Sequence, residues 1–164
     1  MDEETVYGYV TLAEAEEYIA SHFIYDDPLR FAWDALEAAD KIVLLTRSFD
    51  SIEMLPFVGR KTEENQPNAF PRWPLTEVPK EIKMAQIDNA ITLLDSSATE
   101  DAEHYRTLWR YGVNAYVIGN LSEKIGEGAW GNSPTANAEI VSNKAETLLK
   151  RFLRGSYTIR GPKV

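Results

Sequence analysis

The segment from Phe57 to Val78 constrains the fold of this chain more than any other part of it. The segment combines prolines, arginines and large aromatic side chains between two helical patterns. A compact domain seldom holds so long a structureless loop unless the loop is functional. Solvated linkers rarely contain Phe57, Phe70 and Trp73 together, so we expect these side chains to be buried in the domain or in a subunit interface. We also expect Arg72 to be paired.

A second interpretation of this loop stays open. Arg60, Lys61 and Arg72 stand beside Phe70 and Trp73, and such a mixture can form a stacking platform for single-stranded nucleic acid. In the alternative, the aromatics fill the space between helices and Arg72 pairs with a carboxylate. The net charge of −9 favours the alternative, because an acidic molecule repels a polyanion. We therefore expect no measurable affinity for short single strands at physiological salt.

Helical periodicity dominates the rest of the chain. Thr11 with Glu14 matches a capping box, and Asp27 before Pro28 is a second start signal. The patterns predict helices over about 12–23, 28–54, 79–94 and 137–153, β-prone segments over 7–10 and 114–122, and either a helix or a loop over 99–108.

These elements predict a mainly α protein. We expect an antiparallel helical bundle with a long aromatic and proline-containing loop, a small β element and a C-terminal helical arm. The predicted divisions are a helical core over residues 1–125, a glycine-rich hinge over 126–136, and a C-terminal helix with an extended tail over 137–164.

The C-terminal helix and tail are basic, unlike the acidic body. Arginine and aromatic anchors suit docking onto an acidic, apolar partner. The candidate docking residues are Arg151, Phe152, Arg154, Tyr157, Ile159 and Arg160. In the competing interpretation the helix folds back and completes the core of its own domain with Ile140, Leu148, Leu149 and Phe152. Both interpretations stay open.

The residue patterns do not predict an enzyme. His22 and His104 are far apart and have no ligand partners nearby, and the clustered carboxylates are typical of helix caps and solvated faces. No phosphate-binding glycine loop and no nucleophile elbow is present. We predict no catalytic, cofactor-binding or metal-binding residues. The acidic N-terminus and the lack of a long apolar run argue against a signal peptide and a membrane helix.

Several blocks of the sequence resemble a known family. These are Tyr9-Val-Thr-Leu-Ala-Glu-Ala-Glu-Glu-Tyr, Phe57-x-Gly-x-Lys, Phe70-Pro-Arg-Trp-Pro, Val78-Pro-x-Glu-Ile-x-x-Ala and Ile118-Gly-x-Leu-Ser-Glu, with Trp33 in a long helix. In this order they resemble small tailed-phage proteins that often carry the label "DnaT-like single-stranded DNA-binding". The layout is similar to that of the head–tail adaptor, or connector, proteins of long-tailed phages.

The resemblance implies a virion structural protein of the phage neck, made in the cytoplasm of the bacterial host. Such adaptors form a homo-oligomeric ring, usually dodecameric, beneath the portal protein and extend the DNA channel toward the next neck or tail-terminator protein. They have no catalytic residues, no cofactor and no membrane contact, and DNA passes through them only as cargo. An acidic channel would let DNA pass without sticking. The alternative that the resemblance implies is a single-stranded DNA-binding replication accessory protein.

Overall fold

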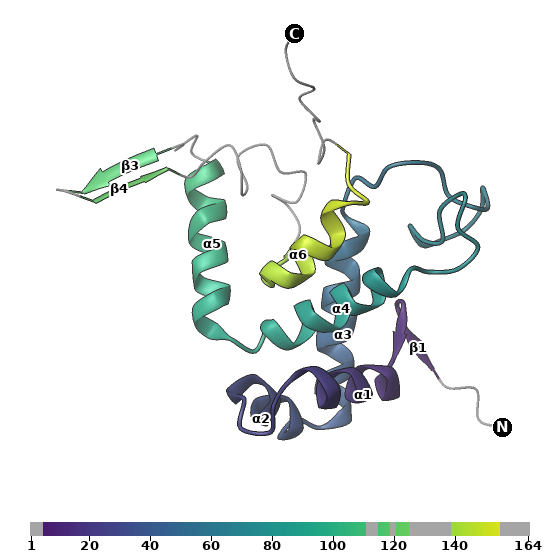
Figure 1. The fold of residues 1–164 in the computed structure, drawn as a ribbon, viewed down its shortest axis with the longest axis horizontal. Coiled ribbons are helices and arrows are strands. Elements are labelled where there is room, and N and C mark those ends of the chain that lie inside the picture. The colour runs from purple at the N-terminus through teal and green to yellow at the C-terminus, as the bar shows by residue number, and fades with distance from the viewer. Residues whose placement is uncertain (1–4, 111–114, 119–120, 125–138, 155–164) are drawn as a thin grey trace, which may run out of the picture.

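The computed structural model describes residues 5–110, 115–118, 121–124 and 139–154 (Figure 1). Within these ranges the protein is mainly helical, which confirms the predicted fold class. The helices are α1 (Leu12–His22), α2 (Pro28–Asp34), α3 (Ala38–Glu53), α4 (Lys80–Thr92), α5 (Ser96–Arg110) and α6 (Asn143–Lys150). Two small antiparallel hairpins accompany them, β1 (Val6–Tyr7) with β2 (Val10–Thr11) and β3 (Ala115–Ile118) with β4 (Leu121–Lys124).

The local signals at the N-terminus give the predicted structure. Thr11 caps α1, with its hydroxyl accepting from the Glu14 amide and the Glu14 carboxylate accepting from the Thr11 amide. The segment predicted to be β-prone is a hairpin that turns at Gly8. Gly8 has a φ of +82°, and a Cβ atom there would lie 2.4 Å from the ring of Phe49, so the turn requires glycine.

The single helix predicted over 28–54 is wrong. The chain breaks after Asp34, and α3 begins after Glu37, whose backbone is extended. In one straight helix Trp33 and Leu44 would lie about 16 Å apart along the axis. The break lets Trp33 pack in one buried cluster with Leu44 from α3, so tertiary packing overrides the continuous helical period.

The remaining boundaries shift by a few residues. The ambiguous segment 99–108 lies inside helix α5, where Asp95 accepts hydrogen bonds from the amides of Ser97 and Ala98. The β-prone segment near 114–122 contains the β3–β4 hairpin, in which Ile118 pairs with Leu121. The last helix is shorter than predicted. It begins at Asn143, because the Ser142 hydroxyl accepts a hydrogen bond from the amide of Ala145 and caps the helix there. The predicted hinge over 126–136 lies outside the described residues.

Helix α4 is the centre of the fold. It packs most extensively against α6 and α3, and it also touches α1 and α2. Its buried residues lie all round the helix, as expected for an element covered on every side. Three of them are polar, and two of these are fully buried and satisfied. The Gln86 amide bridges the backbone of Tyr7, Tyr9 and Leu45, and Asn89 binds residues 139–142.

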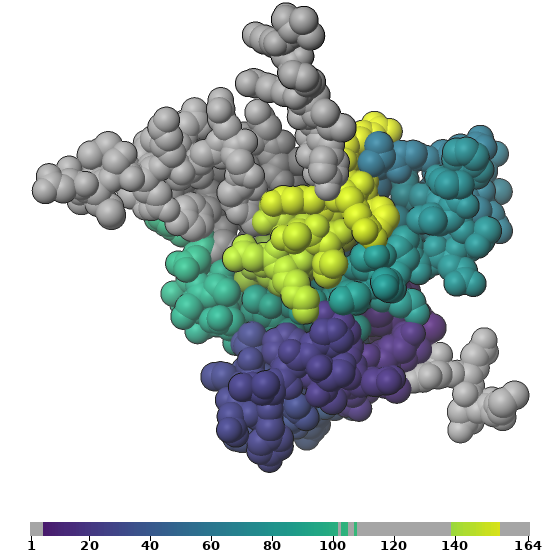
Figure 2. All heavy atoms as spheres, viewed as in Figure 1, coloured from purple at the N-terminus to yellow at the C-terminus, as the bar shows by residue number. Residues whose placement is uncertain are grey.

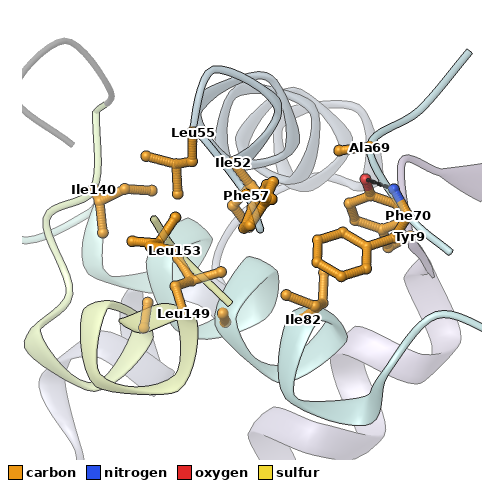
Figure 3. Close-up of a cluster of buried hydrophobic side chains, with 12 residues drawn as sticks. Tyr9, Ile52, Leu55, Phe57, Ala69, Phe70, Ile82, Ile140, Leu149 and Leu153 are labelled. Atoms are coloured by element: carbon orange, nitrogen blue, oxygen red, sulfur yellow. Dashed lines mark hydrogen bonds between the residues drawn. The ribbon is translucent and has the colours of Figure 1, made fainter. Parts of the chain in front are cut away.

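Helix α6 belongs to the core of the domain. Leu149 is fully buried, and Ile140, Ala145 and Leu153 share its cluster with Phe57, Phe70 and Ile82 (Figure 3). Asn89 fixes the approach to the helix, since its Oδ1 accepts from the amide of Val141 at 2.8 Å. Of the two placements left open by the sequence, the described part of the chain has the second, in which the helix folds back onto its own core.

Candidate functional site

The aromatic loop is held to the body by Tyr9 and Glu53. The Tyr9 hydroxyl donates to the Glu53 carboxylate and accepts from the amide of Phe70 at 3.1 Å. The same carboxylate accepts from the amide of Ala69 at 2.8 Å. Burial, followed by the hydrogen bond and the negative charge of Glu53, raises the pKa of Tyr9 well above its usual range. The phenol therefore stays protonated and keeps its role as donor.

Two of the three predicted loop aromatics are buried. Phe57 and Phe70 lie edge to face with ring centroids 4.7 Å apart, and Phe70 also meets Phe152 at 5.6 Å. The loop and the C-terminal segment, far apart in the sequence, thus form one layer. Figure 2 shows the yellow C-terminal segment pressed against the blue and teal loop.

Backbone hydrogen bonds join the same two segments. The amide of Val58 donates to the Phe152 carbonyl at 2.7 Å, and the amide of Arg154 donates to the Pro56 carbonyl at 3.0 Å. The structure therefore brings together two sets of candidate residues that the sequence suggested separately, the loop set and the first half of the C-terminal set. Tyr157, Ile159 and Arg160 lie outside the described residues.

Arg72 is paired, but with backbone carbonyls and not with a carboxylate. Its guanidinium donates to the carbonyls of Val58 at 2.8 Å, Ala69 at 3.2 Å and Phe57 at 3.4 Å, and also to that of Gly59. The planar fork of arginine can reach several acceptors at once, so one side chain closes the loop on itself. A lysine contributes in the same way, since Lys61 Nζ donates to the carbonyls of Gln66 and Pro67.

Trp73 differs from the other two aromatics, because its side chain is 62% exposed. Of the two burial sites expected for it, the interior of its own domain is excluded. The guanidinium of Arg60 lies over the indole, 5.5 Å from the ring centroid. Val58 and Leu75 are exposed nearby in the sequence. The loop thus presents a solvent-facing indole and a cation on a framework that Arg72 holds closed.

The arginines of the loop and of the C-terminal segment differ in their ion pairing. Arg151 forms an ion pair with Glu81. A backbone hydrogen bond and the Arg151 partnership together outweigh burial and lower the pKa of Glu81. Within the described residues, neither Arg60 nor Arg154 makes an ion pair, so both cations can meet an anion.

A second polar cluster, which no sequence spacing indicates, joins α1, α4 and α6. The buried Asp88 accepts from the Tyr18 hydroxyl at 2.6 Å and pairs with Lys144 at 3.1 Å. His22 stacks on the Tyr18 ring, with centroids 3.8 Å apart. Burial and the neighbouring Asp88 raise the pKa of Tyr18 well above its usual range. The Tyr18 hydroxyl therefore keeps its proton and its role as donor, and the cluster acts as a structural tie between three helices.

In the described ranges, no group of three or more histidine, cysteine, aspartate or glutamate side chains could hold a metal ion. No described helix combines the length and apolarity needed to cross a membrane.

Comparison with known protein families identifies a family for this chain. A family model with the description "Putative DnaT-like ssDNA binding protein" covers residues 4–161. The chain belongs to this family. The matched range includes the whole aromatic loop, with Arg60 and Trp73, and the C-terminal helix. No match was found among curated proteins or among solved structures.

Proposed function

We propose that this DnaT-like protein binds single-stranded DNA, with Trp73 as the contact for bases and Arg60 as a contact for phosphate. The observation that carries the proposal is the exposed indole with a cation over it, on a loop fixed by hydrogen bonds. Aromatic side chains stack on any base, and each stacked base contributes about 1–3 kcal/mol. The family description supports this choice of ligand.

The net charge of −9 limits how strong this binding can be. Long-range repulsion opposes the approach of a polyanion, so the local cations must supply the attraction. Arg60 lies at the indole, and Arg154 follows α6 where its amide is bonded to Pro56 at the start of the loop. We expect weak binding that is measurable at low ionic strength and lost toward physiological salt.

The proposed role is binding and not catalysis, and it requires no cofactor. The titratable cluster of Tyr18, Asp88 and Lys144 supports this view. Its members bond to one another, since Asp88 accepts from the Tyr18 hydroxyl and pairs with Lys144. The raised pKa of Tyr18 keeps that hydroxyl from acting as a base near neutral pH.

Fluorescence anisotropy with labelled oligo-dT at about 20 mM salt tests the DNA-binding proposal. Trp73→Ala should weaken binding by about 5- to 150-fold, the equivalent of 1–3 kcal/mol. Trp73→Phe should keep most of the affinity, because it keeps an aromatic face. Leu75→Ala is the matched control, since Leu75 is an exposed apolar residue of the same loop without a ring. Equal binding by Trp73→Ala and the wild type would refute the proposal.

A second candidate function is that of a head–tail adaptor in the neck of a tailed phage. Two observations favour it. The net charge of −9 suits a channel through which DNA passes as cargo, and several large apolar side chains are exposed, as expected of a protein that assembles with others. In this role the chain would form a homo-oligomeric ring between the portal and the next neck or tail-terminator protein.

The two candidates differ in their partners. Negative-stain imaging of the protein mixed with portal rings tests the adaptor directly, and a ring of added density on the portal would support it. Absence of the chain from purified virions would exclude it. The anisotropy measurement is independent of both results.

A further inference from the structure

The turn between α1 and α2, together with α2 itself, carries the most exposed large apolar residues in the described part of the chain. Ile24, Tyr25 and Phe31 are 75%, 80% and 75% exposed. Three strongly exposed large apolar residues within positions 24–31 are more than the scattered single residues found on most surfaces. We call these three residues the α1–α2 corner.

Arg30 holds the turn within the α1–α2 corner in a fixed shape. Its guanidinium donates to the carbonyl of Phe23 at 2.8 Å and lies 5.8 Å from the centroid of the Tyr25 ring. The carboxylate of Asp27 accepts from the amide of Leu29 at 2.8 Å and caps α2. A surface held in this way loses little conformational entropy when a partner binds.

The charges around the corner are acidic. Asp26, Asp34 and Glu37 are exposed, and Asp34 lies three residues after Phe31, on the same side of α2. Arg30 is the cation within this stretch, and it is engaged with backbone carbonyls and with Asp34 at 3.7 Å. The corner therefore suits a ligand with apolar and cationic side chains.

A segment with those properties exists in this chain. Residues 155–164 include Tyr157, Ile159, Arg160 and Lys163 and contain no acidic side chain. The segment begins after Arg154, whose amide is bonded to Pro56. The yellow end of the described C-terminal segment lies across the molecule from α2 (Figure 1). That separation favours a corner on another molecule as the acceptor over the corner of the same molecule.

We infer that the α1–α2 corner binds residues 155–164 of a second copy of this chain. Tyr157 and Ile159 meet the apolar side chains, and Arg160 and Lys163 meet the carboxylates. Such a contact joins two different surfaces, so each molecule can use its corner and its tail at the same time. The contact is separate from the Trp73 surface and does not depend on DNA binding.

Sedimentation equilibrium of the full chain over a range of concentrations tests this contact. The wild type should form species larger than a dimer, and the double variants Tyr25→Ser with Phe31→Ser and Arg160→Glu with Lys163→Glu should each be monomeric. Val43→Ser with Met54→Ser is the matched control, because Val43 is exposed on α3 and Met54 directly after it, both outside the corner. All variants change exposed or terminal residues, so their melting curves should match that of the wild type.

Mixing the two deficient variants gives the decisive result. One variant keeps an intact tail and the other an intact corner, so the mixture should form a one-to-one dimer and stop there. Self-association of the tail variant would show instead that corner meets corner. A mixture that stays monomeric, or a wild type that is monomeric at every concentration, would also overturn the inference.

Discussion

Tyr9 and Glu53 meet in a partly buried hydrogen bond although 44 positions separate them in the sequence. Each also binds one backbone amide of the aromatic loop, Tyr9 that of Phe70 and Glu53 that of Ala69. The pair therefore ties the loop to the end of α3. Because Phe70 packs against Phe57 and Phe152, this small polar contact also positions the layer that carries Trp73.

Removing the Tyr9 hydroxyl should destabilise the protein while leaving its apolar packing in place. Tyr9→Phe leaves the Phe70 amide and the Glu53 carboxylate without their shared partner in a buried site, which costs about 1–3 kcal/mol. Urea unfolding measures the loss. Tyr7→Phe is the control, because the Tyr7 hydroxyl makes no hydrogen bond within the described residues. An equal loss in both variants would contradict this assignment.

Stability should also fall at alkaline pH. The pKa values of Tyr9 and Tyr18 are raised above the ordinary value of 10.0 in the folded protein. In the unfolded chain both phenols ionise near that value, so above pH 10 the unfolded state binds fewer protons than the folded state. The free energy of unfolding therefore decreases as pH rises above about 10. The double variant Tyr9→Phe with Tyr18→Phe should show a shallower decrease between pH 9 and pH 11, and an unchanged slope would count against the raised pKa values.

Arg72 should be irreplaceable by lysine. Arg72→Lys keeps the charge but loses the fork that reaches four carbonyls, so the loop should open more often. We expect the amides of Thr62 and Trp73, which are bonded across the loop, to exchange about tenfold faster with solvent deuterium. Arg60→Lys is the control, since the interaction that the Arg60 guanidinium makes among the described residues is with the Trp73 ring and not with loop carbonyls. Unchanged exchange in Arg72→Lys would mean that the backbone bonds alone close the loop.

Much of the helical framework could be predicted from the sequence, because caps and periodicity are local signals. The capping box of Thr11 and Glu14 and the Asp27–Pro28 start are examples. The break after Asp34 could not be predicted, since the period of apolar residues continues through it. Only the packing of Trp33 against α3 decides that the chain must turn.

The candidate site was predictable in composition but not in geometry. The loop was recognisable from its aromatics, prolines and arginines, yet a loop without a period does not reveal which side chains face inward. Trp73 therefore could not be distinguished from Phe70, which lies only three residues earlier. Tyr9 and Glu53, which hold the loop, have no spacing that connects them to it, because their contact exists only after the chain folds.

The C-terminal helix should be necessary for folding. Ending the chain after residue 138 removes Ile140, Leu149 and Leu153 from the cluster that also contains Phe57 and Phe70. It also leaves the buried Asn89 without the backbone groups of residues 139–142. The exposed apolar surface and the unpaired amide both oppose folding. We expect the shortened protein to lose its cooperative thermal transition and to aggregate.

Two further variants separate the helix from the tail. Leu149→Ala should cost about 2–5 kcal/mol, because the side chain is fully buried and leaves a cavity. A chain ending at Arg154 keeps every buried residue of α6 and should melt like the full protein, while losing the self-association assigned to residues 155–164. Differential scanning calorimetry measures all three proteins. A cooperative transition at the wild-type temperature in the chain ending at residue 138 would show that the helix is an appendage, because a helix that completes the core cannot be removed without loss of stability.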